Sequence, residues 1–582
     1  MAEPKLHAGA TPLPISLPVM AFAVRTPSAA TSEPYRYDER ADFTGGLNLR
    51  ADQFNLAVNE SPSLLNVDVD PRGGVSRREA VDIINSTALS DSILSLFSHS
   101  DASNNQVLIG VKSSSNSTLH YATGAAGNFT QITSSAGNIT MTGLQPSQGA
   151  TFNDITYIVN GSLFDTTYAA VSWAGSNNAT RLTPDIDASD GHFPCARYTT
   201  VWGQRVWVAY TLETIDGLQK NRIRWSKVDD AENWTATDFI DVDPGEDGDH
   251  ITGIIADQNR LLVFKQNSVY EVLGFDTDTF QVRNVTRVAG NREGCTPVAT
   301  PAGVFFWYGE SGAFLLTSDD LAWAFERIKP ALDDGSLTLG TAPSLMWFDE
   351  KLWVSTDYQS GDNLAGSDQT NRRNTFMWDP SLGVTGAWTR YDINARSLFA
   401  YRPTGAQHFG LAVTSDVNGT AAFTRVAKVD VDADVDDYNG TTSEEIQSFY
   451  QTGWYVGNRP TFTKRWGKTR TVMLADNTLT VRMGIYKDYD LSTEAVFQTQ
   501  SISGPGGEAT WDSDPSGSGD GVWDVSEWAA GGTSNIYKFF RWPTAGTAKA
   551  ISLRFSVTPS LGARGKWGLT SAVAMYRTRR IR

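Results

Sequence analysis

One pattern recurs along most of the sequence: a short strand, a polar turn, and a second strand rich in Val, Phe, Tyr or Trp. Clear copies are SLFSH (95–99), WGQRVWVAY (202–210), AGVFFWYGESGAFLLT (302–317) and FDEKLWVST (348–356). The copies start roughly 40 to 60 residues apart, which is typical of β-propeller blades. A single four-stranded blade cannot bury both of its faces, so blades stack around an axis. The pattern predicts an all-β chain built on a β-propeller of six or seven blades.

The composition and the strand-like pattern of the sequence change on either side of this repeat. We assign residues 91–440 to the propeller and residues 441–582, which hold at least five strand-like segments, to a β-sandwich or jelly roll. Residues 1–37, rich in Pro, Ala, Ser and Thr, read as an extended or flexible arm. Residues 38–90 read as N-terminal strands leading into the propeller. The one helix that we expect is short and lies between Asp319 and Leu332, with Pro330 ending it.

The net charge is −17, and only 19% of the residues are charged. Such a negative charge most simply keeps a protein soluble. The alternative interpretation is a surface that nucleic acid passes without sticking, because a protein that binds a phosphate backbone carries a basic stripe instead. Four arginines lie in the last seven residues, 576–582, where they could meet an acidic partner. The two cysteines, Cys195 and Cys295, do not make a disulfide framework and fit assembly in a reducing cytosol. No apolar run approaches the ~20 residues that span a membrane, so we expect no membrane insertion.

The acidic loop DVDPGEDGDH, residues 241–250, is the first candidate site. Clustered carboxylates can bind Ca²⁺, although the spacing does not match an EF-hand loop. A solvated acidic turn between blades is the alternative interpretation. The candidate ligands are Asp241, Asp243, Asp247 and Asp249, with Glu246 beside them. The second acidic run, DVDADVDD at 430–437, suits an edge strand protected against pairing.

Other chemistry finds little support in the sequence. The six histidines form no metal-binding spacing, and no glycine pair fits a phosphate-binding loop. SKVDDAENW (226–234) faintly resembles the Asp-box turn of sialidase-like propellers, which is a structural hairpin. A glycosidase needs a carboxylate pair on a shared cleft, and the sequence alone cannot choose one. We therefore expect no enzyme activity and no cofactor.

The segment GGLNLRADQFNLAVNESPSLLNVDVDPRGGVSRRE, within residues 43–80, carries a fixed order of turns and apolar positions. It resembles the N-terminal signature of bacteriophage tail nozzle proteins, also called tail tubular protein B or tail stabilisation proteins. Residues 222–274 look like a propeller blade of the same family. We call residues 43–80 the signature segment.

This resemblance implies a structural protein of the virion, assembled in the host cytoplasm. It implies a ring, expected to be a homohexamer, that forms part of the channel for genome ejection. An adaptor ring and tail fibre or spike proteins are the implied partners, and double-stranded DNA passes without specific binding. An acidic lumen repels phosphate over about a Debye length, ~8–10 Å. The carboxylates of residues 241–249 are then candidates to line the channel.

Two other classes of function remain open. The abundant Trp and Tyr suit a carbohydrate-binding or glycan-cleaving propeller, because aromatic rings stack on sugars. Trp207, Trp307, Trp353 and Trp378 fall inside apolar strand runs, however, and read as blade core. A cellular scaffold that binds protein partners is the third class, and the absence of repeated GH…WD signatures argues against its commonest form.

Overall fold

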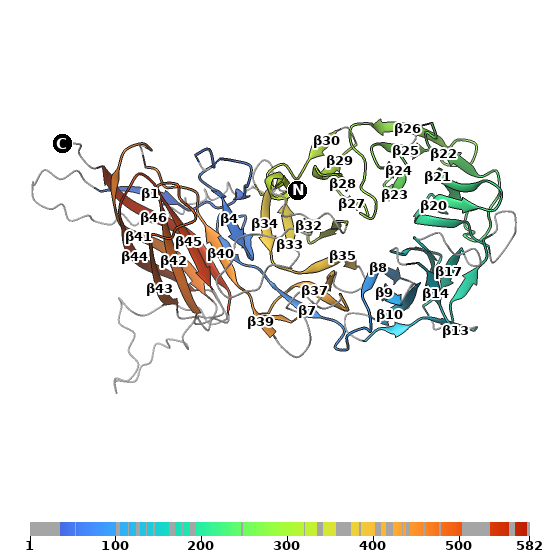
Figure 1. Ribbon diagram of the computed structural model, residues 1–582, viewed down its shortest axis with the longest axis horizontal. Helices are drawn as coiled ribbons and strands as arrows, with labels where there is room; N and C mark the ends of the chain where they lie inside the picture. The colour runs from blue at the N-terminus through green and yellow to red at the C-terminus, as the bar shows by residue number, and fades with distance from the viewer. Residues whose placement is uncertain are drawn as a thin grey trace, which may run out of the picture.

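The computed structural model describes residues 35–578 apart from a set of internal segments. Those segments are 53, 101–104, 114–115, 124–127, 136, 144–145, 162–168, 176–177, 185–191, 246–247, 319, 334–341, 357–373, 383–385, 402–408, 415–422, 434, 438–442, 458–459, 476–478, 503–535 and 558–564. Figure 1 shows two parts along the longest axis, a ring of sheets and a sandwich of long strands. Every structural statement below concerns the described residues.

The ring consists of seven antiparallel sheets; blades 2 to 7 have four strands each, and blade 1 has a fifth short strand, β14, paired with β10. This confirms the predicted all-β propeller and sets the blade number at seven. Blade 1 holds β8 (Ile93–Ser100), β9 (Asn105–Ser113), β10 (Asn116–Thr123), β11 (Thr130–Gln131) and β14 (Thr140–Thr142). Blade 2 holds β15 (Gln148–Phe152), β16 (Ile155–Val159), β17 (Ala170–Trp173) and β18 (Thr180–Leu182). Blade 3 holds β19 (Cys195–Trp202), β20 (Arg205–Glu213), β21 (Gly217–Trp225) and β22 (Phe239–Asp241).

Blades 4 to 7 repeat the same order around the ring. Blade 4 holds β23 (Ile251–Asp257), β24 (Arg260–Lys265), β25 (Val269–Leu273) and β26 (Gln281–Thr286). Blade 5 holds β27 (Val298–Thr300), β28 (Gly303–Tyr308), β29 (Gly312–Leu316) and β30 (Leu321–Trp323). Blade 6 holds β31 (Ser344–Phe348), β32 (Lys351–Thr356), β33 (Asn374–Asp379) and β34 (Ala387–Tyr391). Blade 7 holds β35 (Ala395–Tyr401), β36 (Phe409–Thr414), β37 (Arg425–Val431) and β7 (Ala80–Ile83).

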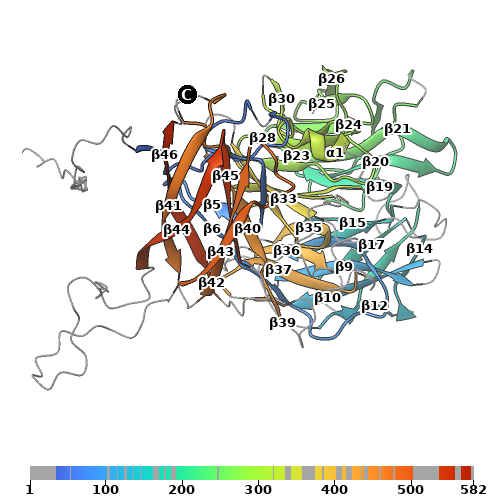
Figure 2. The same ribbon diagram turned by 60° about the vertical axis from the view of Figure 1, so that its left-hand side comes forward.

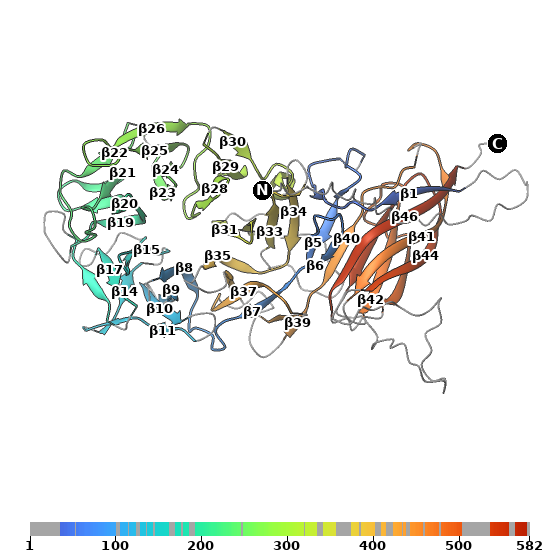
Figure 3. The same cartoon turned by 180° about the vertical axis from the view of Figure 1, so that it is seen from behind.

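The ring closes through its last blade. Each inner strand contacts the inner strand of the next blade, and β35 of blade 7 contacts β8 of blade 1. The outer strand of blade 7 is β7, which comes from the N-terminal side of the propeller and pairs with β37. Figure 3 shows β7 running along β37 near the sandwich. The two ends of the propeller chain therefore meet in one sheet, which ties the ring shut.

The local sequence explains the blades. Middle strands such as β20 and β24 are buried along nearly their whole length because neighbouring blades cover both faces. Tight turns follow the inner strands, with positive φ at Asn153, Asp154, Asp349 and Glu350. Asn and Asp tolerate that left-handed backbone better than most residues, so they suit these two-residue hairpins.

The second part is a sandwich of two antiparallel sheets, the predicted C-terminal fold. The six-stranded sheet has the order β44 (Ile536–Ala548), β41 (Lys464–Ala475), β46 (Trp567–Thr578), β6 (Val75–Arg77), β5 (Val67–Val69), with β1 (Arg36–Arg40) also paired to β46. The five-stranded sheet has the order β4 (Ser63–Leu65), β40 (Ser448–Gln451), β45 (Ile551–Val557), β42 (Leu479–Lys487), β43 (Val496–Ile502). Figure 2 shows strands from both ends of the chain interleaved in this part.

The N-terminal strands thus differ from the expectation that residues 38–90 lead into the propeller. β1, β4, β5 and β6 belong to the sandwich, and only β7 joins the propeller. Asn66, at φ 54°, turns the chain from β4 in one sheet to β5 in the other. The propeller is therefore inserted between two segments of the sandwich. This pairing joins residues about four to five hundred positions apart, which a local pattern cannot reveal.

Three small two-stranded sheets and one helix complete the described structure. The sheets pair β2 (Gly46–Leu47) with β3 (Glu60–Ser61), β12 (Thr133–Ser134) with β13 (Gly137–Asn138), and β38 (Val435–Asp437) with β39 (Ser443–Glu445). The helix α1 spans Lys329–Asp333. Pro330 lies in its first turn instead of ending it, because the first turn does not use the N–H that proline lacks. No helix among the described residues is long and apolar enough to cross a membrane.

Propeller and sandwich share one continuous apolar core. Trp307 and Trp388 of the propeller belong to the same buried cluster as Tyr450 and Trp466 of the sandwich. Phe43 of the signature segment packs edge-on against Tyr450, with ring centroids 5.3 Å apart. Because burying aromatic rings is a major source of stability, the two parts stabilise each other.

Candidate functional site

The signature segment forms the joint between the sandwich and the propeller, and Arg78 lies at its centre. This guanidinium is 1% exposed, between β6 and β7. It makes paired hydrogen bonds to Asp436, at 2.9 and 2.6 Å, and a third to Asp392 at 3.1 Å. Its Nε donates to Asn66 at 2.8 Å. One arginine therefore connects the signature segment to blade 6 and to the segment that follows blade 7.

Asn66 completes the joint from the other side. Its backbone N–H donates to the Arg390 carbonyl of blade 6 at 2.8 Å, and its side-chain amide donates to the Gln447 carbonyl at 2.6 Å. Its side-chain oxygen also accepts from the Asp392 N–H at 3.0 Å. The left-handed backbone at Asn66 makes this arrangement possible, and Asn adopts it more readily than most residues.

A second group of charges lies beside Arg78. The Tyr391 hydroxyl donates to Asp68 of β5. Burial raises the pKa of Asp68, while that hydrogen bond and the positive charges of Lys351 and Arg78 act in the opposite direction. Burial, and the nearby charge of Asp68, also raise the pKa of Asp430 to about 6. The joint therefore contains two carboxyl groups whose pKa is raised above the usual range for aspartate.

The raised pKa of Asp430 predicts a dependence of stability on pH. The folded chain holds this proton more tightly than the unfolded chain, in which an aspartate titrates near pH 4. The stabilisation is fully present below about pH 4 and is lost as the pH rises through about 6. Asp430→Asn should flatten this slope and raise the free energy of unfolding at neutral pH by up to about 2 kcal/mol. Urea denaturation at a series of pH values measures the slope.

Asp432→Asn is the matched control for that prediction. Asp432 is exposed, and Lys566 lowers its pKa through a hydrogen bond. Its replacement should leave the slope between about pH 4 and pH 6 unchanged. Equal slopes for wild type and Asp430→Asn would contradict the account of the joint. Asn also suits the backbone at position 430, where φ is 63° for Asp430.

The run 430–437 does not form the protected edge strand that its alternating Asp pattern suggests. Asp436 is buried and bound to Arg78, and β38 pairs with β39. Asp432 binds Lys566 at 2.6 Å, and Glu79 binds the same lysine at 2.7 Å. Asp436 and Asp432 therefore pair with different cations, Arg78 and Lys566, and Glu79 shares Lys566 with Asp432, which relieves the repulsion between these carboxylates.

The described carboxylates of the acidic loop 241–250 also go to separate partners. Asp241 receives two hydrogen bonds from Arg222, at 2.7 and 3.0 Å. Asp243 accepts from the Tyr270 hydroxyl at 2.5 Å and from Arg287 at 3.0 Å. Asp249 accepts from the Asn267 N–H and the Ser268 hydroxyl, at 2.8 and 2.6 Å. These three side chains therefore hold neighbouring turns and strands in place.

The calcium prediction for this loop depends also on Glu246 and Asp247, which lie outside the described residues. Within the described part of the chain, no three His, Cys, Asp or Glu side chains come close enough together to hold a metal ion. The calcium site and the channel-lining role of this loop stay predictions.

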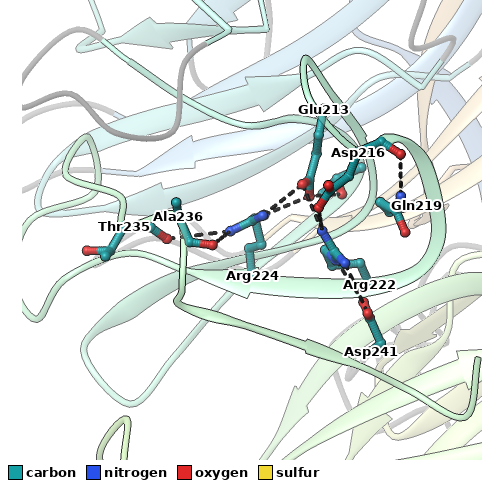
Figure 4. Close-up of polar contacts among 9 residues, drawn as sticks. Glu213, Asp216, Gln219, Arg222, Arg224, Thr235, Ala236 and Asp241 are labelled. Atoms are coloured by element: carbon teal, nitrogen blue, oxygen red, sulfur yellow. Dashed lines mark hydrogen bonds and ion pairs between the residues drawn. The ribbon is translucent and has the colours of Figure 1, made fainter.

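Asp241 belongs to a buried ion-pair network in blade 3, shown in Figure 4. Glu213, at the end of β20, accepts from Arg224 at 2.7 and 2.8 Å and from Arg222 at 2.9 Å. Arg222 also reaches Asp216 at 2.7 Å. Both guanidinium groups lie over the ring of Phe239, at 3.8 and 4.8 Å from its centroid. Although burial alone would raise the pKa of Glu213, hydrogen bonds from Arg224 and Thr211 bring it below its usual value.

This network was not among the sites expected from the sequence, although RIRW at 222–225 carries a signal for it. Two arginines two positions apart on a strand point to the same face of its sheet. Buried arginines need carboxylate partners, and the nearest candidate in the preceding strand is Glu213. The network ties the β20–β21 hairpin to the strand before the acidic loop.

A further polar cluster lies where blades 3 and 4 meet. Glu293 binds Arg197 at 2.5 Å and lies 3.5 Å from His250. These contacts, with His250 the larger influence, lower the pKa of Glu293 to about 2. The Arg197 guanidinium covers the ring of Tyr210 at 4.4 Å from its centroid. The arrangement fixes loops of adjacent blades.

The two cysteines are buried and are not joined to each other. Burial raises the pKa of Cys295 to about 12, which leaves it protonated and unreactive at neutral pH. His192, three positions before Cys195, is hydrogen-bonded to Thr183 at 2.8 Å. The free thiols agree with the expectation that the two cysteines form no disulfide framework.

Strand pairing and blade closure define the chain as a β-propeller protein with a β-sandwich. No family model matches the sequence, and no curated protein matches it. Among solved structures, PorZ of the type-IX secretion system of Porphyromonas gingivalis is 10% identical (TM-score 0.32; 66% of this chain covered). The match spans 44% of the PorZ chain.

Two further solved structures are similar at the same low level. A protein from Lactobacillus plantarum is 18% identical, with a TM-score of 0.33, over 59% of this chain and 96% of its own. An exo-β-1,3-galactanase from Phanerochaete chrysosporium is 10% identical, with a TM-score of 0.21, over 76% of this chain and 98% of its own.

Proposed function

We propose that this chain is a structural component of a bacteriophage tail, a ring subunit of the nozzle or distal tail tube. The observation that carries the proposal is the position of the signature segment. The residues that suggest the resemblance, Asn66, Asp68 and Arg78 among them, form the joint that holds the sandwich against the propeller. A family signature made of joint residues suits a protein whose task is to keep a fixed shape.

The partners follow from that proposal. Copies of the chain would form a ring, expected to be a homohexamer, with an adaptor ring above it and fibre or spike proteins at its side. The net charge of −17 suits a channel through which DNA slides without binding. The fold and the joint are held together without a disulfide, so assembly in the host cytoplasm suits the chain. The virion tail is the proposed location.

Negative-stain electron microscopy of the purified chain, alone and with its adaptor protein, tests the ring. We expect rings with a central hole in at least one of the two samples. Monomers in both samples would contradict the proposal.

Glycan binding is the second candidate, and one exposed aromatic favours it. Trp323 on β30 is 37% exposed, and its ring stacks on Phe314 with an interplanar angle of 11°. Its indole N–H donates to the Ser311 carbonyl at 2.8 Å, which fixes the ring. A rigid, exposed aromatic face is a surface on which a sugar ring can stack.

The Trp323→Ala variant separates the two candidates. If the propeller binds glycans at this face, the variant should lose binding on a glycan array about tenfold or more, since aromatic stacking contributes about 0.5–1.5 kcal/mol beyond the area buried. Trp234→Phe, inside blade 3, is the control for folding. The tail proposal instead expects no glycan signal from the wild-type chain and no effect of Trp323→Ala on ring formation.

A further inference from the structure

Charge is divided unevenly between the two parts of the chain. Residues 80–440, which hold the propeller, carry 23 basic and 43 acidic residues, a net charge of −20. Residues 441–582, which hold most of the sandwich, carry 17 basic and 12 acidic residues, a net charge of +5. Figures 1 and 3 place β41, β44 and β46 at the end of the molecule remote from the propeller. The long axis therefore runs from an acidic end to a basic end.

The basic end is concentrated on the outer face of the six-stranded sheet. Along β41, the outward side chains Arg465, Lys468 and Arg470 alternate with buried Trp466 and Thr471. Arg541 on β44 lies directly opposite Arg470, and Arg577 on β46 lies directly opposite Arg465. The face thus gathers five cations on three adjacent strands.

Aromatic side chains extend the same face toward β1. Tyr37 is 53% exposed and lies opposite Met575 of β46. The Arg577 guanidinium lies 5.4 Å from the ring centroid of Tyr35. Glu39, opposite Val573, adds one carboxylate to this face. Arginine and tyrosine are the residue types that interfaces between proteins favour.

This arrangement costs the isolated chain stability. Like charges directly opposite each other on one sheet face repel, as at Arg465 and Arg577. Of the remaining exposed cations of the face, Lys468 lies on β41, the same strand as Arg465, and Arg541 lies on the neighbouring strand β44. An anionic partner laid on the face would remove the repulsion.

A matching anionic surface exists at one end of the propeller. Blades 2 to 6 are four-stranded meanders, so their first and third turns lie at the same end of the ring. The Asn153 side chain donates to the Asp229 carbonyl at 3.3 Å, and Arg260 donates to the Thr317 carbonyl at 3.3 Å, which joins such turns of neighbouring blades. Exposed carboxylates in these turns include Asp154, Asp229, Asp276, Asp278, Asp349 and Glu350.

We propose that the basic outer face of the six-stranded sheet, formed by Arg465, Lys468, Arg470, Arg541 and Arg577, binds the acidic turn end of the propeller of a second copy of this chain. The contact joins two different surfaces, so it is heterologous and generates a closed ring or an open fibre. The inference rests on the proposed ring function and names the surfaces that would form the ring contact.

A second copy fits this face better than the DNA backbone does. The cations occupy a patch on three strands, the chain itself supplies the opposite charge, and its net charge of −17 repels DNA. Complementary charge also sets partner choice and register more than it sets affinity. A contact of this kind weakens as salt rises.

Charge reversal followed by sedimentation velocity tests the contact. The sandwich variant is Arg465→Glu with Lys468→Glu, and the propeller variant is Asp278→Lys with Glu350→Lys. We expect the wild type to associate at low salt. Each variant alone should associate at least about tenfold more weakly than the wild type. An equal mixture of the two variants should recover association, because the reversed charges complement each other across copies.

Lys220→Glu is the matched control, an exposed cation on β21 at the opposite end of blade 3, and should leave association unchanged. Unchanged association of the sandwich variant, a wild type that stays monomeric at low salt, or no recovery in the mixture would each overturn the inference. The inference would also be overturned if the wild type bound duplex DNA in a salt-dependent way and only the sandwich variant lost that binding. If antibody still labels tails while the charge reversals have no effect, this inference fails and the proposed function stands.

Discussion

Replacing Arg78 with Ala should lower the free energy of unfolding by about 3–5 kcal/mol, because it leaves Asp436 and Asp392 buried without their cation. The loss falls on the joint, so the sandwich and the propeller should unfold at separate temperatures in calorimetry. The signature segment should at the same time become sensitive to protease. Arg78→Lys should recover little, because lysine cannot reproduce the paired hydrogen bonds.

Arg72→Ala is the control for this change. Arg72 is exposed in the turn between β5 and β6, and the hydrogen bond that holds this turn uses its backbone N–H and not its guanidinium. Its replacement should change the free energy of unfolding by no more than an ordinary surface substitution does, about 0.5 kcal/mol. A similar small shift for Arg78→Ala would show that the joint does not depend on this residue.

Replacing Glu213 with Ala should cost a similar amount, about 3–5 kcal/mol, since Arg222 and Arg224 would remain buried without their shared carboxylate. The β20–β21 hairpin depends on that carboxylate, so hydrogen exchange should rise in the hairpin and in β22 before the rest of blade 3. Urea denaturation measures the stability, and exchange followed by mass spectrometry locates the loss.

Asp216→Ala distinguishes the buried carboxylate from an exposed one. Asp216 binds the same Arg222, but its side chain is 47% exposed. Exposed ion pairs contribute about 0–1 kcal/mol, so this variant should stay close to the wild type. If both variants had the same small effect, the buried network would add little to the stability of the blade.

The class of fold could be predicted because blade strands carry their own local signal. Strands such as β20, β24 and β28 are apolar runs bounded by turn residues, and their spacing repeats along the chain. The number of blades was ambiguous because the seventh blade is finished by β7, a four-residue strand about 340 positions before its partner β37. A repeat search cannot see a strand contributed from outside the repeat.

The sandwich shows the same limit. The strand-like segments expected within residues 441–582 correspond to strands such as β41, β42, β45 and β46. Strands were expected within residues 38–90, yet the sheets that β4, β5 and β6 join are set by contacts with β40 and β46 at the other end of the chain. Nothing in the local sequence around Asn66 states which sheet each neighbouring strand joins.

The candidate site was the least predictable part. The acidic loop at 241–250 drew attention by charge density, but Asp241, Asp243 and Asp249 each have a different partner in space. The residues that hold the two parts together, Asn66 and Arg78, carry no chemical pattern that separates them from other polar residues. Their role follows from three-dimensional contacts with Asp392, Asp436 and Gln447.

Antibody labelling of tailed particles tests the central claim most directly. An antibody raised against the purified chain is applied to tailed particles from cells that make this protein, and gold label is located by electron microscopy. The tail proposal predicts label confined to the tail, with loss of the tail tip or of labelled particles when the gene is disrupted. Intact tails without label, from cells that demonstrably produce the chain, would contradict it.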